Sequence, residues 1–277
     1  MTANFPPSPE LRRTAAIDAD RYARDYAQSV ADPERFWGLV GQRLNWIKPY
    51  TRVRDVSFLP EDFRVRWYYD GVLNVAVNCL DRHLAARGND NAILFEGDSP
   101  NSSENITYRD LYERVCRLGN ALRTLGIKKG DRVTLYLPMI PEAAVAMLAC
   151  ARIGAVHSVV FGGFSPEALI GRIEDCQSAL VITADEGMRG GKSVPLKANV
   201  DAALENPATA CVRNVLVVRH TGNPITWVSE RDQWLQELTA AESTQCEPEP
   251  MNAEDPLFIL YTSGSTCLLY TSPSPRD

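Results

Sequence analysis

The sequence predicts an α/β protein in which a mainly parallel sheet is covered by helices on both faces and preceded by an aromatic-rich helical leader. Strand-like and helical apolar patterns alternate from residue 130 onward, which is typical of parallel strands joined by crossover helices. Glycine-rich segments follow two of the predicted strands, and an apolar run at 257–261 stops in a loop of small hydroxyl residues. Aromatic residues concentrate before residue 72. Together these features predict a leader over residues 14–72 and a main domain over residues 73–266.

Composition limits the classes of partner. The chain has 277 residues, 45% of them hydrophobic, and a net charge of -6, which argues against nucleic acid or an anionic membrane as the general partner. Its seven cysteines are scattered without a C-x-x-C pair, so neither a zinc site nor a disulfide framework is predicted. Residues 1–13 have no signal-peptide core, and prolines and charged residues interrupt the apolar stretch 133–164. We therefore expect a soluble, cytoplasmic protein.

The leader carries clear helix signals. Asp32-Pro33-Glu34 supplies a capping side chain, a proline for the first turn and an acid for the positive end of the helix dipole. Phe36, Val40 and Leu44 then recur on one helical face. Because a short leader cannot bury all of its tryptophans and tyrosines alone, we expect it to pack across the main domain.

The main domain opens with local signals of the same kind. A helix beginning near Leu73 should end at Gly88, followed by a strand at 92–96 and a polar loop at 97–105. Thr107 and Asp110 resemble a capping box, and they open a helix that should end at Gly126.

Strands and helices then alternate along the chain. The predicted strands are 132–137, 155–160, 179–183 and 215–218, and the predicted helices are 141–153, one from Ser165-Pro166 and one from Ser193. Loops at the carboxyl edge of an open parallel sheet face the crevice in which ligands of such folds bind. Loops 161–164, 187–192 and 262–266 should therefore form a composite nucleotide-type site. The acidic segment 241–255 is predicted to be an exposed linker.

The loop at 262–266 is a candidate anion site. Residues 257–261 predict a buried central parallel strand, and Thr262, Ser263, Gly264, Ser265 and Thr266 supply hydroxyls and unhindered backbone amides. These residues alone are equally consistent with a plain polar turn. No lysine follows a glycine here, so this is not a Walker loop.

A second candidate anion site surrounds two glycines. Arg189 and Lys192 flank Gly190 and Gly191 ahead of a helix with Ser193 as its expected N-cap, so cations and a helix dipole would converge on one anion. A solvated basic turn is the alternative, and the location at the ligand edge of the sheet favours the anion site. Gly191-Lys192-Ser193 imitates the end of a P-loop NTPase motif, but Glu186 stands where its first glycine is required.

Several motifs together resemble one family. Tyr261-Thr-Ser-Gly-Ser-Thr266 is similar to the phosphate loop of the acyl-adenylate-forming ligases. Asn78-Cys-Leu-Asp-Arg-His83, Lys129-Gly-Asp-Arg-Val133, Met147-Leu-Ala-Cys-Ala-Arg-Ile-Gly154 and Val160-Phe-Gly-Gly-Phe-Ser165 extend the similarity, over residues 14–266, to the AMP-forming acetyl-CoA synthetases. The resemblance implies a partial adenylation domain of that fold.

The resemblance also implies ligands. Thr262, Ser263, Gly264, Ser265 and Thr266 would bind ATP phosphates, and Phe161, Gly162, Gly163, Arg189, Gly190, Gly191 and Lys192 would bind coenzyme A. The substrates would be acetate, ATP with Mg²⁺, and CoA, without a tightly bound prosthetic group. No catalytic residue and no metal ligand is assigned within the chain, because the family's catalytic lysine and acyl pocket lie downstream of the matching region.

The end of the sequence departs from the family pattern. After Thr266 the family continues Gly-x-Pro-Lys-Gly, whereas this chain continues from Cys267 without that lysine and repeats Leu-Tyr-Thr-Ser. Residues 267–277 resemble translated adapter sequence and are left out of the fold prediction. We therefore expect a truncated domain that is inactive by itself. A propionate-type ligase fragment and a non-catalytic CoA- or nucleotide-binding fragment remain alternatives.

Overall fold

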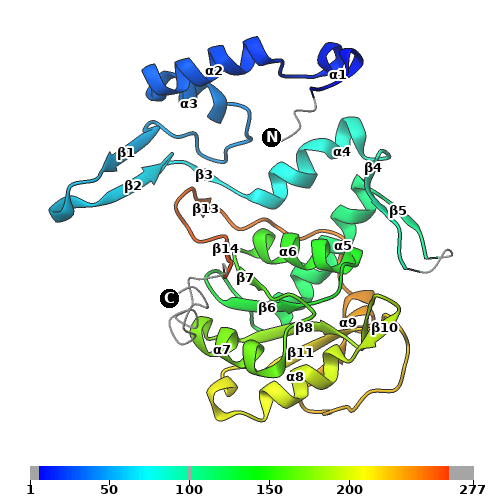
Figure 1. The fold of residues 1–277 in the computed structure, drawn as a ribbon. Helices are drawn as coiled ribbons and strands as arrows, with labels where there is room; N and C mark the ends of the chain where they lie inside the picture. Colours follow the sequence, from blue (N-terminus) through cyan, green and yellow to red (C-terminus); the bar gives the residue numbers. More distant parts are fainter. Residues whose placement is uncertain (1–5, 99–101, 262–277) are drawn as a thin grey trace, which may run out of the picture.

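The centre of the protein is a six-stranded sheet in which every neighbouring pair is parallel, as the computed structural model shows over residues 6–98 and 102–261 (Figure 1). The strand order is β12-β11-β8-β6-β7-β14. The strands are β6 (Arg132–Tyr136), β7 (Val156–Val159), β8 (Leu180–Ala184), β11 (Asn214–Val218), β12 (Asp232–Trp234) and β14 (Phe258–Ile259). The predicted mainly parallel α/β sheet is thus confirmed.

Helices cover both faces of this sheet. Helices α5 (Tyr108–Thr124), α6 (Pro141–Ile153) and α9 (Leu235–Ala240) gather on one face, and α7 (Pro166–Cys176) and α8 (Leu196–Leu204) lie on the other (Figure 1). Local signals set their ends as predicted: Thr107 and Asp110 form the capping box of α5, and Gly154 ends α6 with a φ of 74°. The buried core extends through both layers, from Leu118 of α5 to Leu216 of β11.

The predicted polar loop at 97–105 is partly wrong. Strand β5 (Glu104–Thr107) pairs antiparallel with β4 (Asn91–Phe95) and forms a hairpin beside α5. Ahead of the hairpin, the helix predicted to end at Gly88 consists of a π-helical segment (Val77–Asp81) that continues into α4 (Arg82–Arg87).

The segment 241–255 is not the exposed linker that its composition predicts. Arg117 and Asn120 of α5 donate hydrogen bonds to carbonyl groups of residues 240–245, and Arg152 Nε donates to the Cys246 carbonyl at 2.6 Å. The Cys246 side chain is buried beside Gly119, and β13 (Met251–Asn252) pairs with β3 (Val72–Leu73). Donors that lie far away in the sequence satisfy this backbone, so its own residue pattern cannot reveal the packing.

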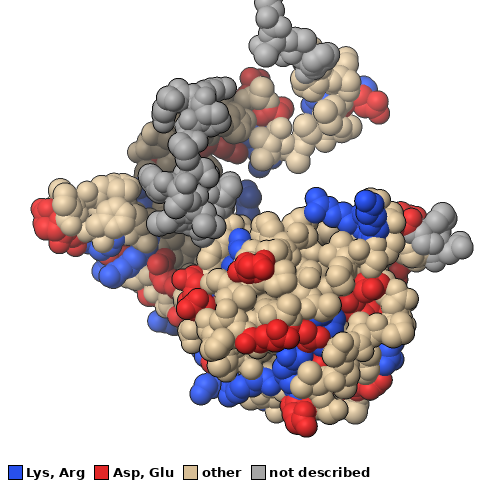
Figure 2. All heavy atoms as spheres, turned by 60° about the horizontal axis from the view of Figure 1, so that its bottom comes forward, with Lys and Arg blue, Asp and Glu red and all other residues tan. Residues whose placement is uncertain are grey.

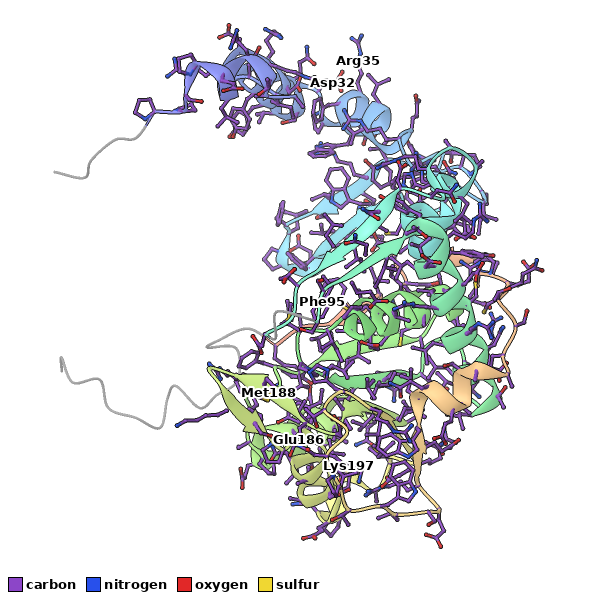
Figure 3. The ribbon with its side chains drawn as sticks, turned by 90° about the vertical axis from the view of Figure 1, so that its right-hand side faces the viewer. Asp32, Arg35, Phe95, Glu186, Met188 and Lys197 are labelled. Atoms are coloured by element: carbon purple, nitrogen blue, oxygen red, sulfur yellow. The ribbon has the colours of Figure 1, made fainter. Side chains whose placement is uncertain are left out.

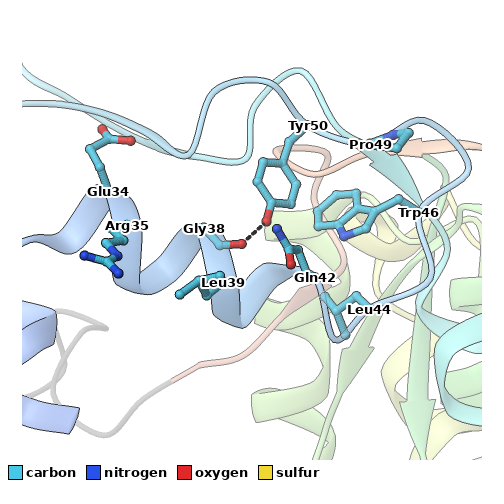
Figure 4. A pocket seen from close by; sticks show the side chains of 9 residues that line it. All are labelled: Glu34, Arg35, Gly38, Leu39, Gln42, Leu44, Trp46, Pro49 and Tyr50. Atoms are coloured by element: carbon cyan, nitrogen blue, oxygen red, sulfur yellow. Dashed lines mark hydrogen bonds between the residues drawn. The ribbon is translucent and has the colours of Figure 1, made fainter. Parts of the chain in front are cut away.

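The leader consists of α1 (Pro9–Thr14), α2 (Ala19–Ala31), α3 (Pro33–Gly41) and the antiparallel pair β1 (Arg54–Ser57) and β2 (Arg64–Trp67), all apart from the central sheet (Figure 1). Asp32 caps α3 by accepting the Arg35 N–H at 3.1 Å, as predicted. The rings of Trp46, Tyr50 and Tyr68 pack against one another, and the Tyr50 hydroxyl donates to the Gly38 carbonyl (Figure 4). A short 3-10 turn occupies Pro60–Asp62 in the leader, and another occupies Pro207–Thr209 after α8 in the main domain.

The apolar strand at 257–261 does not lie at the centre of the sheet, where the sequence predicts it. Among the described residues, β14 lies at one edge of the sheet and pairs only with β7, and Phe258 keeps 53% of its surface exposed. An apolar run indicates a strand but carries no information on its place in the sheet order. His157 stacks on Phe258, and no described residue forms a hydrogen bond with its Nδ1 atom.

Candidate functional site

A cavity of about 610 Å³ lies beyond the carboxyl ends of four parallel strands. The segments after β6, β7, β8 and β11 line it together with the β4–β5 hairpin: residues 137–140, 161–163, 187–190, 220–221 and 95–98 with Ser102. Figure 3 shows Phe95 above Met188, with Glu186 at the base of the segment that carries Met188. This is the edge at which ligands of open parallel sheets bind. The predicted gathering of loops 161–164 and 187–192 is therefore present, whereas loop 262–266 lies outside the described residues.

Two glycines allow the loop after β7 to lie close to its neighbours. A Cβ atom on Gly162 would lie 3.2 Å from the Leu137 carbonyl oxygen. A Cβ on Gly163 would lie 2.6 Å from Arg189 Nη1 and from the Phe161 ring. Both positions therefore exclude larger side chains unless the neighbours move. The loop leaves the Phe161 ring half exposed at the cavity wall.

Tyr136 holds the end of the same loop. Its hydroxyl donates to the Phe164 carbonyl at 2.7 Å and accepts a hydrogen bond from Asn199 Nδ2 at 3.0 Å. Burial raises the pKa of Tyr136, so the phenol remains the protonated donor that this contact requires.

Residues 187–194 form a β-hairpin and do not lead directly into a helix. Strands β9 (Gly187–Arg189) and β10 (Lys192–Val194) pair antiparallel, and Gly190 and Gly191 turn between them with φ values of 56° and 73°. Two positive φ angles are what a type I′ hairpin turn requires, and Gly-Gly supplies them without steric cost. The predicted N-cap at Ser193 is therefore wrong, because Ser193 pairs with Met188 and α8 begins only at Leu196. The anion site has no helix dipole at this position.

The hairpin brings Arg189 to the loop after β7. Arg189 Cζ lies 5.1 Å from the centroid of the Phe161 ring, a cation–π distance. Phe161, Gly162, Gly163, Arg189 and Gly190 all line the one cavity. Gly191 and Lys192 are exposed on the outer part of the hairpin and do not line it. Five of the seven residues that the sequence analysis predicted to bind coenzyme A therefore share one wall of the cavity.

Asp185 at the end of β8 joins the hairpin base to the loop after β11. Its carboxylate accepts backbone N–H groups of Glu186, His220, Thr221 and Gly222 at 2.7 to 3.1 Å. Burial opposes ionisation of Asp185, but the four donors outweigh it and hold the pKa below its usual value. Sequence reasoning missed this residue, although an aspartate directly after a buried strand is a signal that could have marked it.

Glu186 fixes the hairpin to the same loop. Its carboxylate accepts from Asn223 Nδ2 at 2.7 Å and from the Thr221 hydroxyl at 3.4 Å. Hydrogen bonds from Asn223 and then Ser193 lower the pKa of Glu186, so the carboxylate is charged when it holds β10. In the sequence this residue stands out only as a mismatch to a P-loop motif.

Tyr261 is the last described residue before the proposed phosphate loop. Its hydroxyl donates to Asp175 of α7. Burial, followed by this hydrogen bond, raises the pKa of Tyr261, so the phenol is a proton donor here.

The surroundings of the cavity provide no cluster of metal ligands within the described part of the chain. Over residues 6–98 and 102–261, no group of three or more His, Cys, Asp or Glu side chains could hold a metal ion. In the same ranges, none of the helices combines the length and apolarity needed to cross a bilayer.

On the face of the protein that Figure 2 presents, Lys and Arg side chains are interspersed with Asp and Glu side chains.

Two families match adjoining parts of the chain. Residues 22–79 match the family described as acetyl-coenzyme A synthetase N-terminus, and residues 80–268 match the family described as AMP-binding enzyme. The first match covers most of the leader and the second covers the sheet, its helices and the cavity.

Individual relatives extend this similarity. The chain is 62% identical over 267 residues to the acetyl-coenzyme A synthetase of Xanthomonas campestris pv. campestris (strain 8004), covering 96% of this chain and 41% of the relative. It is 60% identical to the acetyl-coenzyme A synthetase of Rhizobium rhizogenes, covering 95% of this chain and 40% of the relative. The solved structure of acetoacetyl-CoA synthetase from Streptomyces lividans superposes with a TM-score of 0.78 at 27% identity, over 92% of this chain and 38% of that one. The chain thus spans about two fifths of the length of these curated relatives.

Proposed function

Because the chain belongs to the AMP-binding enzyme family, we propose that it provides the CoA-binding and ATP-phosphate-binding part of an acetate:CoA ligase. In this reaction an acetate oxygen attacks the α-phosphorus of Mg-ATP, which releases pyrophosphate and forms acetyl-AMP. The CoA thiol then attacks the acyl carbon and expels AMP. The choice of acetate rests on the relatives, which are named acetyl-coenzyme A synthetases.

The cavity at the carboxyl edge of the sheet is the proposed CoA site. Arg189 would bind a phosphate of the nucleotide end, because a guanidinium offers several donors in a fork that matches phosphate oxygens. The exposed part of the Phe161 ring, with Gly162, Gly163 and Gly190, would form the wall against which the ligand packs. Lys192, with Gly191, stands on the outer part of the hairpin and would attract the anionic ligand from there.

The ATP phosphates are assigned to the loop that follows Tyr261. Thr262, Ser263, Gly264, Ser265 and Thr266 supply hydroxyl and backbone donors for the pyrophosphate leaving group. Mg²⁺ would enter as the Mg-ATP substrate. What the bound metal supplies is charge neutralisation on the phosphates.

We also propose a cytoplasmic location. All six described cysteines are free thiols, which is the usual state of cysteines in the reducing cytoplasm. The partners that we propose for the protein are its small-molecule substrates acetate, ATP and CoA.

The observation that carries the CoA assignment is the convergence of Arg189 with loop 161–163 on one cavity wall. Isothermal titration of the 277-residue chain with CoA and with pantetheine tests it. Because pantetheine lacks the phosphates that Arg189 would hold, it should bind at least about 10-fold more weakly than CoA. Equal affinity for the two ligands, or no heat of CoA binding to a chain whose circular dichroism shows it folded, would overturn the assignment.

A further inference from the structure

Helix α7 contacts both the loop 161–164 and Tyr261, the residue that precedes the segment to which the proposed function assigns the ATP phosphates. The N-cap residue of α7 directly follows Phe164. In the last turn of the helix, the Asp175 carboxylate accepts a hydrogen bond from the Tyr261 hydroxyl. One α7 side chain, Arg172, contacts the rings of both Phe164 and Tyr261. Arg172 Cζ lies 4.7 Å from the ring centroid of Phe164 and 5.1 Å from that of Tyr261.

Each of the two aromatic residues that Arg172 contacts also has a hydrogen bond to another part of the protein. The Phe164 backbone is held by the Tyr136 hydroxyl, and the Tyr261 hydroxyl is held by Asp175. Arg172 Nη1 donates to the Ala168 carbonyl in its own helix at 2.8 Å, which orients the guanidinium. A planar guanidinium can stack on aromatic faces on both of its sides, whereas a compact ammonium cannot.

We propose that Arg172 is a positioning residue that couples the loop 161–164 to Tyr261, at the end of the described chain. Displacement of either ring changes the surface on which the guanidinium rests, so the position of Phe164 depends on that of Tyr261. The identity of the two ligands, CoA and ATP, rests on the proposed function, whereas the contact itself does not. Occupancy of the phosphate loop would in this way alter the affinity for CoA.

Hydrogen exchange tests the physical link without any ligand. In the 277-residue chain, Arg172→Met should speed amide exchange by roughly 5-fold in peptides covering both 161–164 and 257–261, because a cation–π contact with each ring is lost. Arg172→Lys should restore at most one of the two segments. Arg219→Met is the matched control, since Arg219 Cζ lies 4.3 Å from the ring centroid of Trp234 and, among the described residues, Arg219 contacts neither Phe164 nor Tyr261. Acceleration of neither segment, of one segment alone, or equally of the core peptide 214–218 would overturn the positioning role.

Binding measurements then test the coupling. The dissociation constant of CoA is measured with and without saturating Mg-ATP, in the native chain and in Arg172→Met. We expect the dissociation constant of CoA to change by at least about 5-fold on adding Mg-ATP to the native chain and to stay constant in the variant, since couplings between sites usually reach this size. An identical CoA affinity with and without Mg-ATP in the native chain overturns the coupling. If the native chain binds neither ligand, the proposed function fails, while the exchange data still decide whether Arg172 holds the segments 161–164 and 257–261.

Discussion

Arg189 lies over the ring of Phe161, with 5.1 Å between its Cζ atom and the ring centroid, and this contact joins two loops that follow different strands. Gly163 makes the approach possible, since a Cβ atom there would lie 2.6 Å from Arg189 Nη1. The hairpin and the loop after β7 therefore form one continuous wall of the cavity. A ligand phosphate beside Arg189 would be next to an aromatic surface, a combination suited to a nucleotide.

Replacing Arg189 by alanine should weaken CoA binding. Loss of a charge-assisted hydrogen bond costs ~1.5 to 3 kcal/mol, or roughly 10- to 150-fold in the dissociation constant. Titration of the variant with CoA and separately with Mg-ATP measures this effect. Mg-ATP affinity should stay at its native value, and Arg219→Ala, at an arginine outside the cavity, should leave both affinities unchanged. A parallel loss of Mg-ATP affinity in Arg189→Ala would show that the hairpin serves ATP or the fold.

Glu186→Gln should loosen the hairpin without unfolding the chain. The amide keeps the shape of the side chain but loses the charge that strengthens the hydrogen bonds from Asn223 and Ser193. We expect CoA affinity to fall by about 5-fold, corresponding to ~1 kcal/mol, and peptides covering 187–194 to exchange faster. The exposed Glu230→Gln serves as the control. Native exchange rates in the hairpin of Glu186→Gln would refute its positioning role.

Local signals made most of the sheet and its helices predictable. The capping box of Thr107 and Asp110 and the left-handed Gly154 act within a few residues of the helix ends that they define. The sequence also placed loops 161–164 and 187–192 at the same edge, because parallel strands end on the same side of a sheet. The direction of the strands alone determines this placement, whichever side chains are in contact.

The hairpin and the segment 241–255 depend on contacts that are distant in the sequence. Strands β9 and β10 have three residues each, too few for an alternating pattern, and Glu186 and Asp185 hold them through the loop after β11. Gly190-Gly191 is nevertheless a recognisable hairpin signal, which the interpretation as an anion site passed over. Residues 241–255 lie against α5 because arginine and asparagine side chains take up their carbonyls.

Alanine at Gly190 or Gly191 should strain the hairpin turn. Both residues have positive φ values, and a Cβ atom at either position would meet only open space, so the cost is conformational and not steric crowding. Each substitution should lower the free energy of unfolding by ~1 kcal/mol, whereas asparagine, which tolerates this region, should cost less. Gly171→Ala is the control, because Gly171 lies within α7 with open space beside it and should gain about 0.5 to 1 kcal/mol. Urea denaturation of these five variants measures the differences, and a neutral Gly190→Ala would show that the turn does not limit the stability of the chain.

Acidification should destabilise the chain through His157. Burial between β6 and β14 lowers the pKa of His157 to about 4, whereas an unfolded histidine titrates near 6.5. Between these two values the unfolded chain binds the additional proton, so stability is complete above the unfolded pKa and falls as the pH drops toward 4. From pH 7 to pH 5 the loss should reach ~2 kcal/mol, since one pKa unit corresponds to about 1.4 kcal/mol. Urea denaturation at both pH values tests this, with His157→Phe expected to reduce the difference by that amount and His83→Gln, at a partly exposed histidine, expected to retain it. An unchanged pH dependence in His157→Phe would mean that other groups cause the acid sensitivity and that His157 accepts its proton in the folded sheet.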